Sequence, residues 1–279
     1  MTIYKPKVRA PHPKQIEKTQ NILRQNNLTT VCEEAACPNR FECYQRKSAT
    51  FMILGNTCTR SCAFCNVKTG KGEKVDATEP IRLANAIYQL KLKYVVITSV
   101  DRDDLKDFGA SHFYNCVKAI KAKNPNVKIE LLTPDFRYNI DALNLIIQSN
   151  VYKLAHNQET VERLSKYIRP QSNYIRSLKV LEYYAKNSNA IIKSSIMLGL
   201  GEEEKEIIQT LKDLYNAGAT EITIGQYLQP SPKHHKVVKY YPQEYFDKLK
   251  DIAYNIGFNA VASGILVRSS YYADKIGDI

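Results

Sequence analysis

Residues 51–67 read FMILGNTCTRSCAFCNV, and this stretch decides the fold. Its first four residues form an apolar run that is typical of a buried strand. Cys58, Cys62 and Cys65 follow at once, in the spacing CxxxCxxC. A strand that leads directly into a reactive loop is typical of parallel α/β sheets, which place their active sites at the carboxyl ends of the strands. The rest of the chain is therefore expected to repeat strand and helix in alternation.

The sequence on either side of this stretch shows that alternation. Between the strands, apolar residues recur three and four positions apart, as they do on the buried face of a helix. One further helix is expected before the first strand, at 14–26, and another near the end, at 242–255. Six strand–helix units predict a parallel sheet with right-handed crossovers, either an open partial barrel or a doubly wound sheet. The six expected strands are 51–54, 94–98, 128–132, 151–154, 191–198 and 221–224.

The composition is that of a globular chain of 279 residues, 44% apolar and 24% charged. No apolar run approaches the ~18 residues of a membrane-spanning helix, and the first residues lack the apolar core of a secretory signal. We therefore expect a cytoplasmic protein, without a membrane, in a compartment where clustered cysteines bind metal or do chemistry. The net charge of +12 fits a nucleic acid, a membrane surface or an acidic protein partner. Scattered lysines without an RNA-binding motif favour an acidic partner or compositional bias over nucleic acid.

The first cysteine set supplies three thiols on one loop, with no fourth ligand nearby. A structural zinc site takes four ligands. A [4Fe–4S] cluster held by three thiolates keeps one iron open for a substrate or cofactor. The amino and carboxylate groups of S-adenosylmethionine (SAM) fit that open iron. The alternatives are a three-ligand zinc site and cysteines that merely pack, which are common in cores.

A second set, Cys32, Cys37 and Cys43, lies just upstream in the spacing CxxxxCxxxxxC. Its spacing is less diagnostic, but six of the seven cysteines fall within 32–65, so a second cluster is more economical than coincidence. This set also lacks a fourth thiol, and its last iron needs a ligand from elsewhere in the fold. Cys116 lies on an apolar helical face, where a small buried residue is the better interpretation.

These residues together resemble a known family, the lipoyl synthases of the radical SAM superfamily, from about residue 30 to 275. One departure is Tyr44, where the ECW that is usual in the family reads ECY, and the chain has no Trp. Tyr keeps a flat ring with a polar tip, so only local packing is affected. The matching segments are VCEEAACPN (31–39), FMILGNTCTRSCAFCNV (51–67), VITSVDRDDL (96–105), ELLTPDF (130–136), HNQETVERL (156–164), KSSIMLGLGE (193–202), TIGQYLQPS (223–231) and VRSSYYAD (267–274).

The resemblance implies a partial (β/α)6 TIM-type barrel, with N-terminal and C-terminal extensions that close over the barrel mouth. It divides the chain into an extension at 1–50 that carries the auxiliary-cluster cysteines, a radical SAM barrel at 51–260 and a tail at 261–279 with the RSSY motif. It also makes Ser270 an oxygen ligand of the auxiliary cluster, a harder and more labile partner for iron than a thiolate. Arg268 is expected to hold the tail or contact that serine.

The activity that the resemblance implies is insertion of sulfur at C6 and C8 of an octanoyl group on a lysine of a lipoyl-carrier protein. Two 4Fe–4S clusters and SAM are the implied cofactors, the auxiliary cluster is the sulfur donor, and the expected catalytic residues are Cys58, Cys62, Cys65 and Ser270. The carriers are E2 subunits of 2-oxoacid dehydrogenases and the glycine cleavage H protein. A ferredoxin or flavodoxin is the implied electron donor, and a monomer is expected.

Contacts to SAM are expected near strand ends, where polar residues of such folds are often functional. Each candidate has a structural alternative as a salt bridge, a helix cap or a solvated side chain. Gly199 and Gly201 permit either a close approach to adenosine or a tight turn. His234 and His235 are interpreted as an exposed loop without a catalytic role. The candidate cofactor contacts are Phe64, Ser99, Asp101, Glu130, Asn157 and Lys193.

Two rival functions remain at this point. A biotin synthase-like sulfur-inserting enzyme is disfavoured, because that group lacks the CEEAACPN and RSSY segments. A zinc-stapled module that binds nucleic acid through its positive charge is the alternative from a different class. Iron content and visible absorbance distinguish a zinc protein from an iron–sulfur enzyme.

Overall fold

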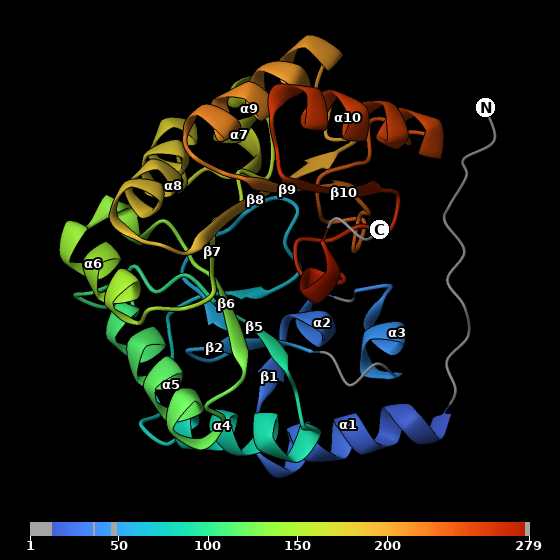
Figure 1. Cartoon of the computed structure of the whole chain (residues 1–279). Coiled ribbons are helices and arrows are strands. Elements are labelled where there is room, and N and C mark those ends of the chain that lie inside the picture. Colours follow the sequence, from blue (N-terminus) through green and yellow to red (C-terminus); the bar gives the residue numbers. More distant parts are fainter. Residues whose placement is uncertain (1–12, 36, 46–48, 277–279) are drawn as a thin grey trace. The chain divides into compact units, whose positions relative to one another are not determined.

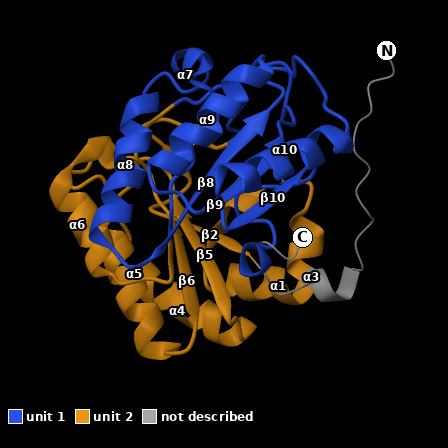
Figure 2. Ribbon diagram, turned by 45° about the horizontal axis from the view of Figure 1, so that its top comes forward, with its two compact units in different colours: residues 1–7, 61–66, 154–279 blue, residues 8–60, 67–153 orange. Residues whose placement is uncertain are grey.

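The computed structural model describes residues 13–35, 37–45 and 49–276 (Figure 1). Residues 1–12, 36 and 46–48 of the extension expected at 1–50 lie outside these residues. Eight strands belong to one mostly parallel sheet, in the order β1-β2-β5-β6-β7-β8-β9-β10. The chain divides into two compact units, which are coloured separately in Figure 2. Unit 1 comprises 1–7, 61–66 and 154–279, and unit 2 comprises 8–60 and 67–153. The three-part division at 50 and 260 stays a prediction.

Unit 2 contains the first parallel strands, which are apolar on both faces. All four residues of β2 are buried, as a strand covered on both sides of a parallel sheet requires. Phe51 of β2 pairs with Ile97 of β5, and Ile97 pairs with Leu131 of β6. Each of these side chains is at most 1% exposed, so each contributes about 1.5–3 kcal/mol to folding.

The strands predicted at 51–54, 94–98 and 128–132 are found within one residue of their expected bounds, whereas β1, α2, α3, β3 and β4 were not predicted. The helix expected at 14–26 begins and ends one residue earlier. β7, Lys153–Ala155, runs across the boundary between the units. The other elements are α1 (Pro13–Gln25), β1 (Thr29–Thr30), α2 (Val31–Glu34), α3 (Arg40–Gln45), β2 (Thr50–Ile53), β3 (Thr57–Cys58), β4 (Lys68–Thr69), α4 (Glu79–Leu90), β5 (Tyr94–Ser99), α5 (Ala110–Lys123), β6 (Lys128–Leu132), a 3-10 turn (Phe136–Tyr138) and α6 (Ile140–Gln148).

The segment before β2 joins the sheet of unit 2. β1 pairs antiparallel with β2, with Thr29 opposite Met52 and Thr30 opposite Phe51. This is the antiparallel pair that makes the sheet mostly, not wholly, parallel. It fixes the segment that carries the second cysteine set to the edge of a buried strand.

Unit 1 repeats the same plan and adds a strand that the sequence did not predict. β10 pairs in parallel with β9 from Ala260 opposite Glu221 to Gly264 opposite Gly225. Its sequence, AVASG, is small and contains a single β-branched residue, so strand propensity alone gives little signal. The elements are α7 (Glu162–Ile168), α8 (Tyr174–Asn187), β8 (Ile191–Leu198), α9 (Glu204–Asn216), β9 (Glu221–Gln226), α10 (Gln243–Ile256), β10 (Ala260–Gly264) and a 3-10 turn (Ala273–Lys275).

Candidate active site

The loop that carries the first cysteine set, residues 58–65, begins in unit 2 and is called the ligand loop below. Cys58 ends the short strand β3, where it pairs with Thr69 of β4, and its carbonyl oxygen accepts a hydrogen bond from Gly70 N at 2.9 Å. Burial raises the pKa of the Cys58 thiol, and the carboxylate of Asp101 adds to that rise. The Asp101 Oδ2 atom lies 3.9 Å from the sulfur. The strand end therefore presents this thiol beside a carboxylate.

Arg60, two residues after that thiol, is the centre of a buried network of charges in unit 2. Its side chain is 2% exposed and faces three carboxylates. Nε and Nη2 bind both oxygens of Asp103 at 2.9 and 2.8 Å, a two-pronged pairing that suits guanidinium geometry. Nη2 also donates to Asp135 at 2.7 Å, and Nη1 lies 3.2 Å from Asp101. The network anchors the start of the ligand loop to the segments that follow β5 and β6.

A strained turn after β6 completes this network. Phe136, Arg137 and Tyr138 are consecutive non-glycine residues with φ of 43°, 53° and 58°, and such conformations cost of order 1–3 kcal/mol each. The turn directs Arg137 back, so that its backbone N–H donates to Asp135 at 3.0 Å and its guanidinium pairs with Asp103. Asp103 thus lies between two arginines. Burial alone raises its pKa, but the hydrogen bonds from those arginines outweigh burial and hold the pKa of Asp103 below its usual value.

The rest of the ligand loop belongs to unit 1 and has anchors of its own. Ala63 N donates to the carbonyl of Ile168 at 2.8 Å, and Cys65 N donates to that of Cys62 at 3.1 Å. At the start of this segment, the Gln171 side-chain oxygen accepts a hydrogen bond from Ser61 N, and Gln171 Nε2 donates to the Ser61 hydroxyl. Both thiol-bearing residues are half-buried.

Phe64, the aromatic residue between those thiols, packs against a small apolar cluster. The cluster consists of Ile168, Leu200 and Tyr227, each at most 2% exposed. Phe64 itself is partly buried, so one side of the ring is fixed by packing. Its expected contact with SAM stays a prediction.

The interpretation of His234 and His235 as an exposed loop was wrong. Both side chains are half-buried. His234 Nε2 lies 3.1 Å from the Cys65 carbonyl oxygen, and His235 Nε2 lies 3.1 Å from that of Leu200. No short-range pattern reveals these contacts, because His234 and Cys65 are 169 positions apart.

The second cysteine set lies on two short helices of unit 2 and on the segment between them. Cys32 on α2 is 6% exposed, and burial raises the pKa of its thiol to about 11. Cys37 follows α2, and its backbone N–H donates to the Cys32 carbonyl at 3.1 Å. Cys43 lies on α3 and is half-buried. Tyr44, the departure from the family pattern, is fully buried, with its hydroxyl 2.9 Å from that of Thr30. The tyrosine therefore fills its site with its polar tip satisfied.

Cys116 faces the core of unit 2 from α5 and is 0% exposed. Burial raises the pKa of its thiol strongly. The packing role expected from the sequence is confirmed for this cysteine.

The tail that carries Ser270 is packed onto β9 within unit 1. A Cβ placed on Gly225 would come within 2.1 Å of the Val267 carbonyl oxygen, so only glycine allows this approach. Arg268 Nη1 donates to the same carbonyl, which belongs to the preceding residue, at 2.6 Å; its expected role in holding the tail stays a prediction. Ser270 is half-buried two residues further on.

The polar candidates for SAM contacts divide by position. Ser99 ends β5, with a buried hydroxyl that has no hydrogen-bond partner among the described residues, and Asp101 follows two residues later. Asn157 follows β7 and donates to Glu159 at 3.0 Å. Glu130 and Lys193 do not lie at strand ends as expected.

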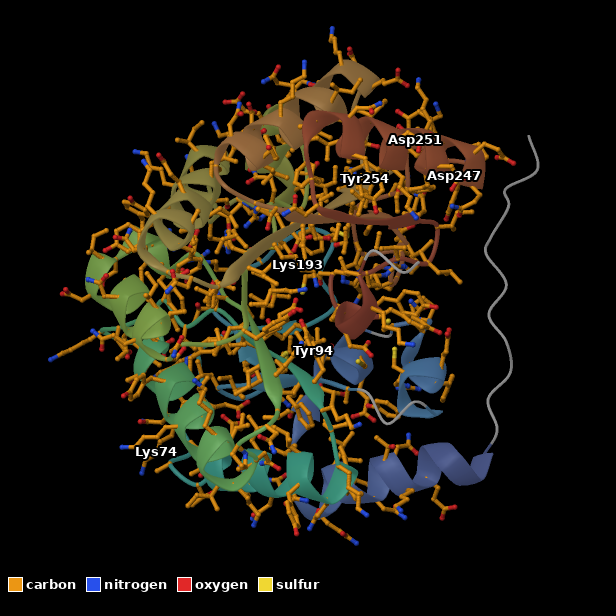
Figure 3. The ribbon with its side chains drawn as sticks, viewed as in Figure 1. Lys74, Tyr94, Lys193, Asp247, Asp251 and Tyr254 are labelled. Atoms are coloured by element: carbon orange, nitrogen blue, oxygen red, sulfur yellow. The ribbon has the colours of Figure 1, made fainter. Side chains whose placement is uncertain are left out.

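Glu130 lies in the middle of β6, is 1% exposed and accepts a hydrogen bond from the Tyr94 hydroxyl. Lys193, labelled in Figure 3, is the third residue of β8 and is also 1% exposed. β6 and β8 have the predicted bounds, so both residues already lie inside the strands predicted at 128–132 and 191–198.

The glycines after β8 form a turn around a carboxylate. Gly199 and Gly201 have φ of 104° and 112°. The side chain of Glu202 accepts hydrogen bonds from Gly199 N at 2.6 Å and Leu200 N at 2.9 Å. These hydrogen bonds and the positive φ angles show that the two glycines form a tight turn, which is one of the two interpretations from the sequence.

The thiols fit an iron–sulfur donor set by their chemistry. Five of the six cysteines in the two sets are half-buried. Partly exposed thiols are typical of cysteines that bind metal, and [4Fe–4S] clusters are held by Cys thiolates. Within 13–35, 37–45 and 49–276, the structure does not bring three metal-ligating side chains into one group. In the same ranges, no helix is long and apolar enough to cross a membrane.

Comparisons with known proteins identify the family. A profile of the radical SAM superfamily matches residues 52–214, more than half of the chain. The lipoyl synthase of Caldicellulosiruptor bescii is 48% identical over 98% of this chain and 94% of its own length. That of Buchnera aphidicola subsp. Baizongia pistaciae is 55% identical over 91% of this chain and 81% of its own length.

A solved structure supports the fold. Streptococcus suis SuiB bound to S-adenosylmethionine has a TM-score of 0.56 at 11% identity, over 78% of this chain and 50% of that chain. Together with the mostly parallel sheet, this likeness confirms the α/β class and is consistent with a partial barrel. The family matches also confirm the expected SAM and iron–sulfur chemistry at the level of the family. By identity and coverage, the chain belongs to the lipoyl synthase family of the radical SAM superfamily.

Proposed function

We propose that this chain inserts sulfur at C6 and C8 of an octanoyl group carried on a lysine of a lipoyl-carrier protein. The observation that carries the proposal is its identity of 48–55% to lipoyl synthases over nearly the whole chain. Both cysteine sets and the RSSY tail lie inside the matched region. The two carbons carry no acidic hydrogen, so an acid or base side chain has no means of activating them.

The residues that would hold the cofactors follow from the family motifs. Cys58, Cys62 and Cys65 would hold the cluster that binds SAM. The auxiliary cluster would be held by Cys32, Cys37, Cys43 and Ser270. When bound, these groups supply a radical that removes hydrogen from an unactivated carbon, together with the sulfur that replaces it. The metal chemistry is thus the cofactors' own, and the protein has to place the ligands.

The chain's own residues perform that placement. In unit 2, the Arg60 network fixes the backbone beside Cys58. In unit 1, the Ile168 carbonyl and the Gln171 side chain hold the remainder of the ligand loop. Fixing the ligands before the metal arrives limits the conformational cost of binding it.

The tail and the polar strand residues complete the proposal. Packing of Val267 against Gly225 sets the position of the segment that carries Ser270. A serine oxygen suits a cluster that gives up sulfur, because oxygen binds iron more weakly than thiolate does. The residues proposed to contact SAM are Phe64, Ser99, Asp101, Glu130, Asn157 and Lys193.

The partners proposed are octanoylated E2 subunits and H protein, with a ferredoxin or flavodoxin as electron donor. The chain has 40 basic and 28 acidic residues, and this net positive charge suits an acidic carrier domain. The enzyme is proposed to be cytoplasmic, because six reduced thiols require a reducing compartment. It is also proposed to be a monomer.

The test is anaerobic incubation of reconstituted protein with SAM, a strong reductant and an octanoyl-lysyl peptide, followed by mass spectrometry. The expected results are about eight irons per chain and a peptide that has gained two sulfur atoms. No sulfur gain with both clusters intact would refute the function. Zinc without visible absorbance would instead support the nucleic-acid-binding alternative.

Two variants test the auxiliary site separately. Ser270→Ala and Cys37→Ala are expected to keep cleavage of SAM and to lose sulfur insertion. Wild-type levels of sulfur insertion in either variant would show that the auxiliary ligand set is wrongly assigned.

A further inference from the structure

The segment that follows β9 lies against the ligand loop within unit 1. It provides two contacts to the backbone of the loop. His235 N donates to the Ala63 carbonyl at 2.9 Å, and His234 Nε2 lies 3.1 Å from the Cys65 carbonyl oxygen. The second contact involves a side chain and reaches the residue that carries a proposed cluster ligand.

The hydrogen-bond partners of His234 define which nitrogen carries its proton. A carbonyl oxygen can only accept, so Nε2 must be protonated to bond with Cys65. In a neutral ring Nδ1 is then an acceptor, and the Ser231 hydroxyl lies 2.9 Å from it. The backbone of His234 is held as well, since its N–H donates to the Ser231 carbonyl and its own carbonyl accepts from Gln229 Nε2 at 2.9 Å. Hydrogen bonds therefore hold both the ring and the backbone of His234.

We propose that His234 is a positioning residue that sets the direction of the Cys65 thiol. The peptide groups on both sides of Cys65 are fixed, since its N–H donates to Cys62 and its carbonyl accepts from His234. Fixing both peptide groups fixes the Cα–Cβ bond and hence the range of positions open to the sulfur. This inference rests on the proposed function, in which that sulfur binds iron.

The neighbouring histidine provides a matched control. His235 lies in the same segment and is equally half-buried. Its ring nitrogen bonds to the Leu200 carbonyl, and its ring lies 6.5 Å from that of Tyr227. A phenylalanine at either position removes one ring donor from the same segment, but only the change at His234 removes a contact to Cys65.

The first measurement uses the protein without iron. Hydrogen exchange of backbone amides in 61–66 is compared for wild type, His234→Phe, His234→Gln and His235→Phe. We expect exchange about fivefold faster in His234→Phe, which corresponds to about 1 kcal/mol. Gln places an N–H donor at a similar reach, so His234→Gln should remain within about twofold of wild type. His235→Phe should also remain within about twofold.

The second measurement uses reconstituted protein. In His234→Phe we expect a changed electron paramagnetic resonance spectrum of the reduced SAM-binding cluster, with wild-type spectra for His234→Gln and His235→Phe. Equal effects of the two phenylalanine variants, or no effect of His234→Phe on exchange, would overturn the inference. If wild-type protein binds no iron, the proposed function fails, while the exchange comparison still decides whether His234 fixes the loop.

Discussion

Replacing Arg60 by methionine should destabilise the protein strongly, because it leaves carboxylates without their shared cation. The largest effect is expected at Asp135, whose side chain is 0% exposed and loses a hydrogen bond of 2.7 Å. Asp103 keeps Arg137, and Asp101 is 23% exposed and partly solvated. Removal of one partner from a buried ion pair costs about 3–5 kcal/mol. We expect the free energy of unfolding to fall by an amount in this range at neutral pH, although methionine keeps most of the apolar stem of the side chain.

The assay is urea unfolding of the iron-free protein under reducing conditions, followed by circular dichroism. A double variant, Arg60→Met with Asp135→Asn, is the matched control, since the amide removes the buried charge and keeps an oxygen for the Arg137 N–H. The double variant should recover about half of the loss, because a buried pair replaced on both sides costs far less than one broken on one side.

The pH dependence adds an independent check on the same reasoning. In the single variant the buried Asp135 carboxyl no longer faces Arg60 and can be relieved by protonation, so the stability deficit of this variant should shrink as pH falls from 7 toward 5. A loss below about 1 kcal/mol, or a double variant no more stable than the single one, would contradict the assignment of Arg60 as the buried counter-charge.

Three further predictions concern other parts of the chain. Gly225→Ala should lower the free energy of unfolding by about 1–3 kcal/mol, because the new Cβ would lie 2.1 Å from the Val267 carbonyl oxygen; thermal unfolding measures this loss. The same variant should reduce sulfur insertion, measured by product mass, more than it reduces SAM cleavage. The folded pKa of Asp103 is depressed, so its stabilisation is complete above an unfolded pKa of about 3.9 and is lost as pH falls through the folded value. Asp103→Asn should therefore make the free energy of unfolding fall less steeply at acid pH than it does in wild type. An unchanged pH dependence would show that the pKa of Asp103 is not depressed. Cys116→Ala should keep iron content and activity within about twofold of wild type, at a cost of about 1 kcal/mol, and lost iron would make that thiol a ligand.

The strands of the sheet could be predicted closely because their signal is local. The bounds of β6 and β8 match the strands predicted at 128–132 and 191–198. β10 was missed because AVASG is defined as a strand by its pairing with β9 and by no pattern of its own. Its hydrogen bonds come from a partner that sequence inspection does not place beside it.

The candidate site was predictable in its ligand types and less so in its supports. The first cysteine set is predicted from its spacing and the second from its proximity to the first, but the partners of Arg60 lie 43 and 75 positions away, and that of His234 lies 169 positions away. Only the folded chain brings such residues together, and each is of a common type in an unremarkable local context. Sequence reasoning therefore recovered the chemistry but not the network that holds it.

The packing of Val267 on Gly225 also bears on how the molecule is made. Translation delivers residues in order at about 5–20 per second, and early segments begin to fold as they emerge. β9 leaves the ribosome some 40 residues before the tail that covers Gly225. Gly225 therefore stays uncovered on that strand until the segment around Val267 has been translated. The proposed ligand set that includes Ser270 is therefore complete only after the segment around Val267 has been translated and packed onto β9.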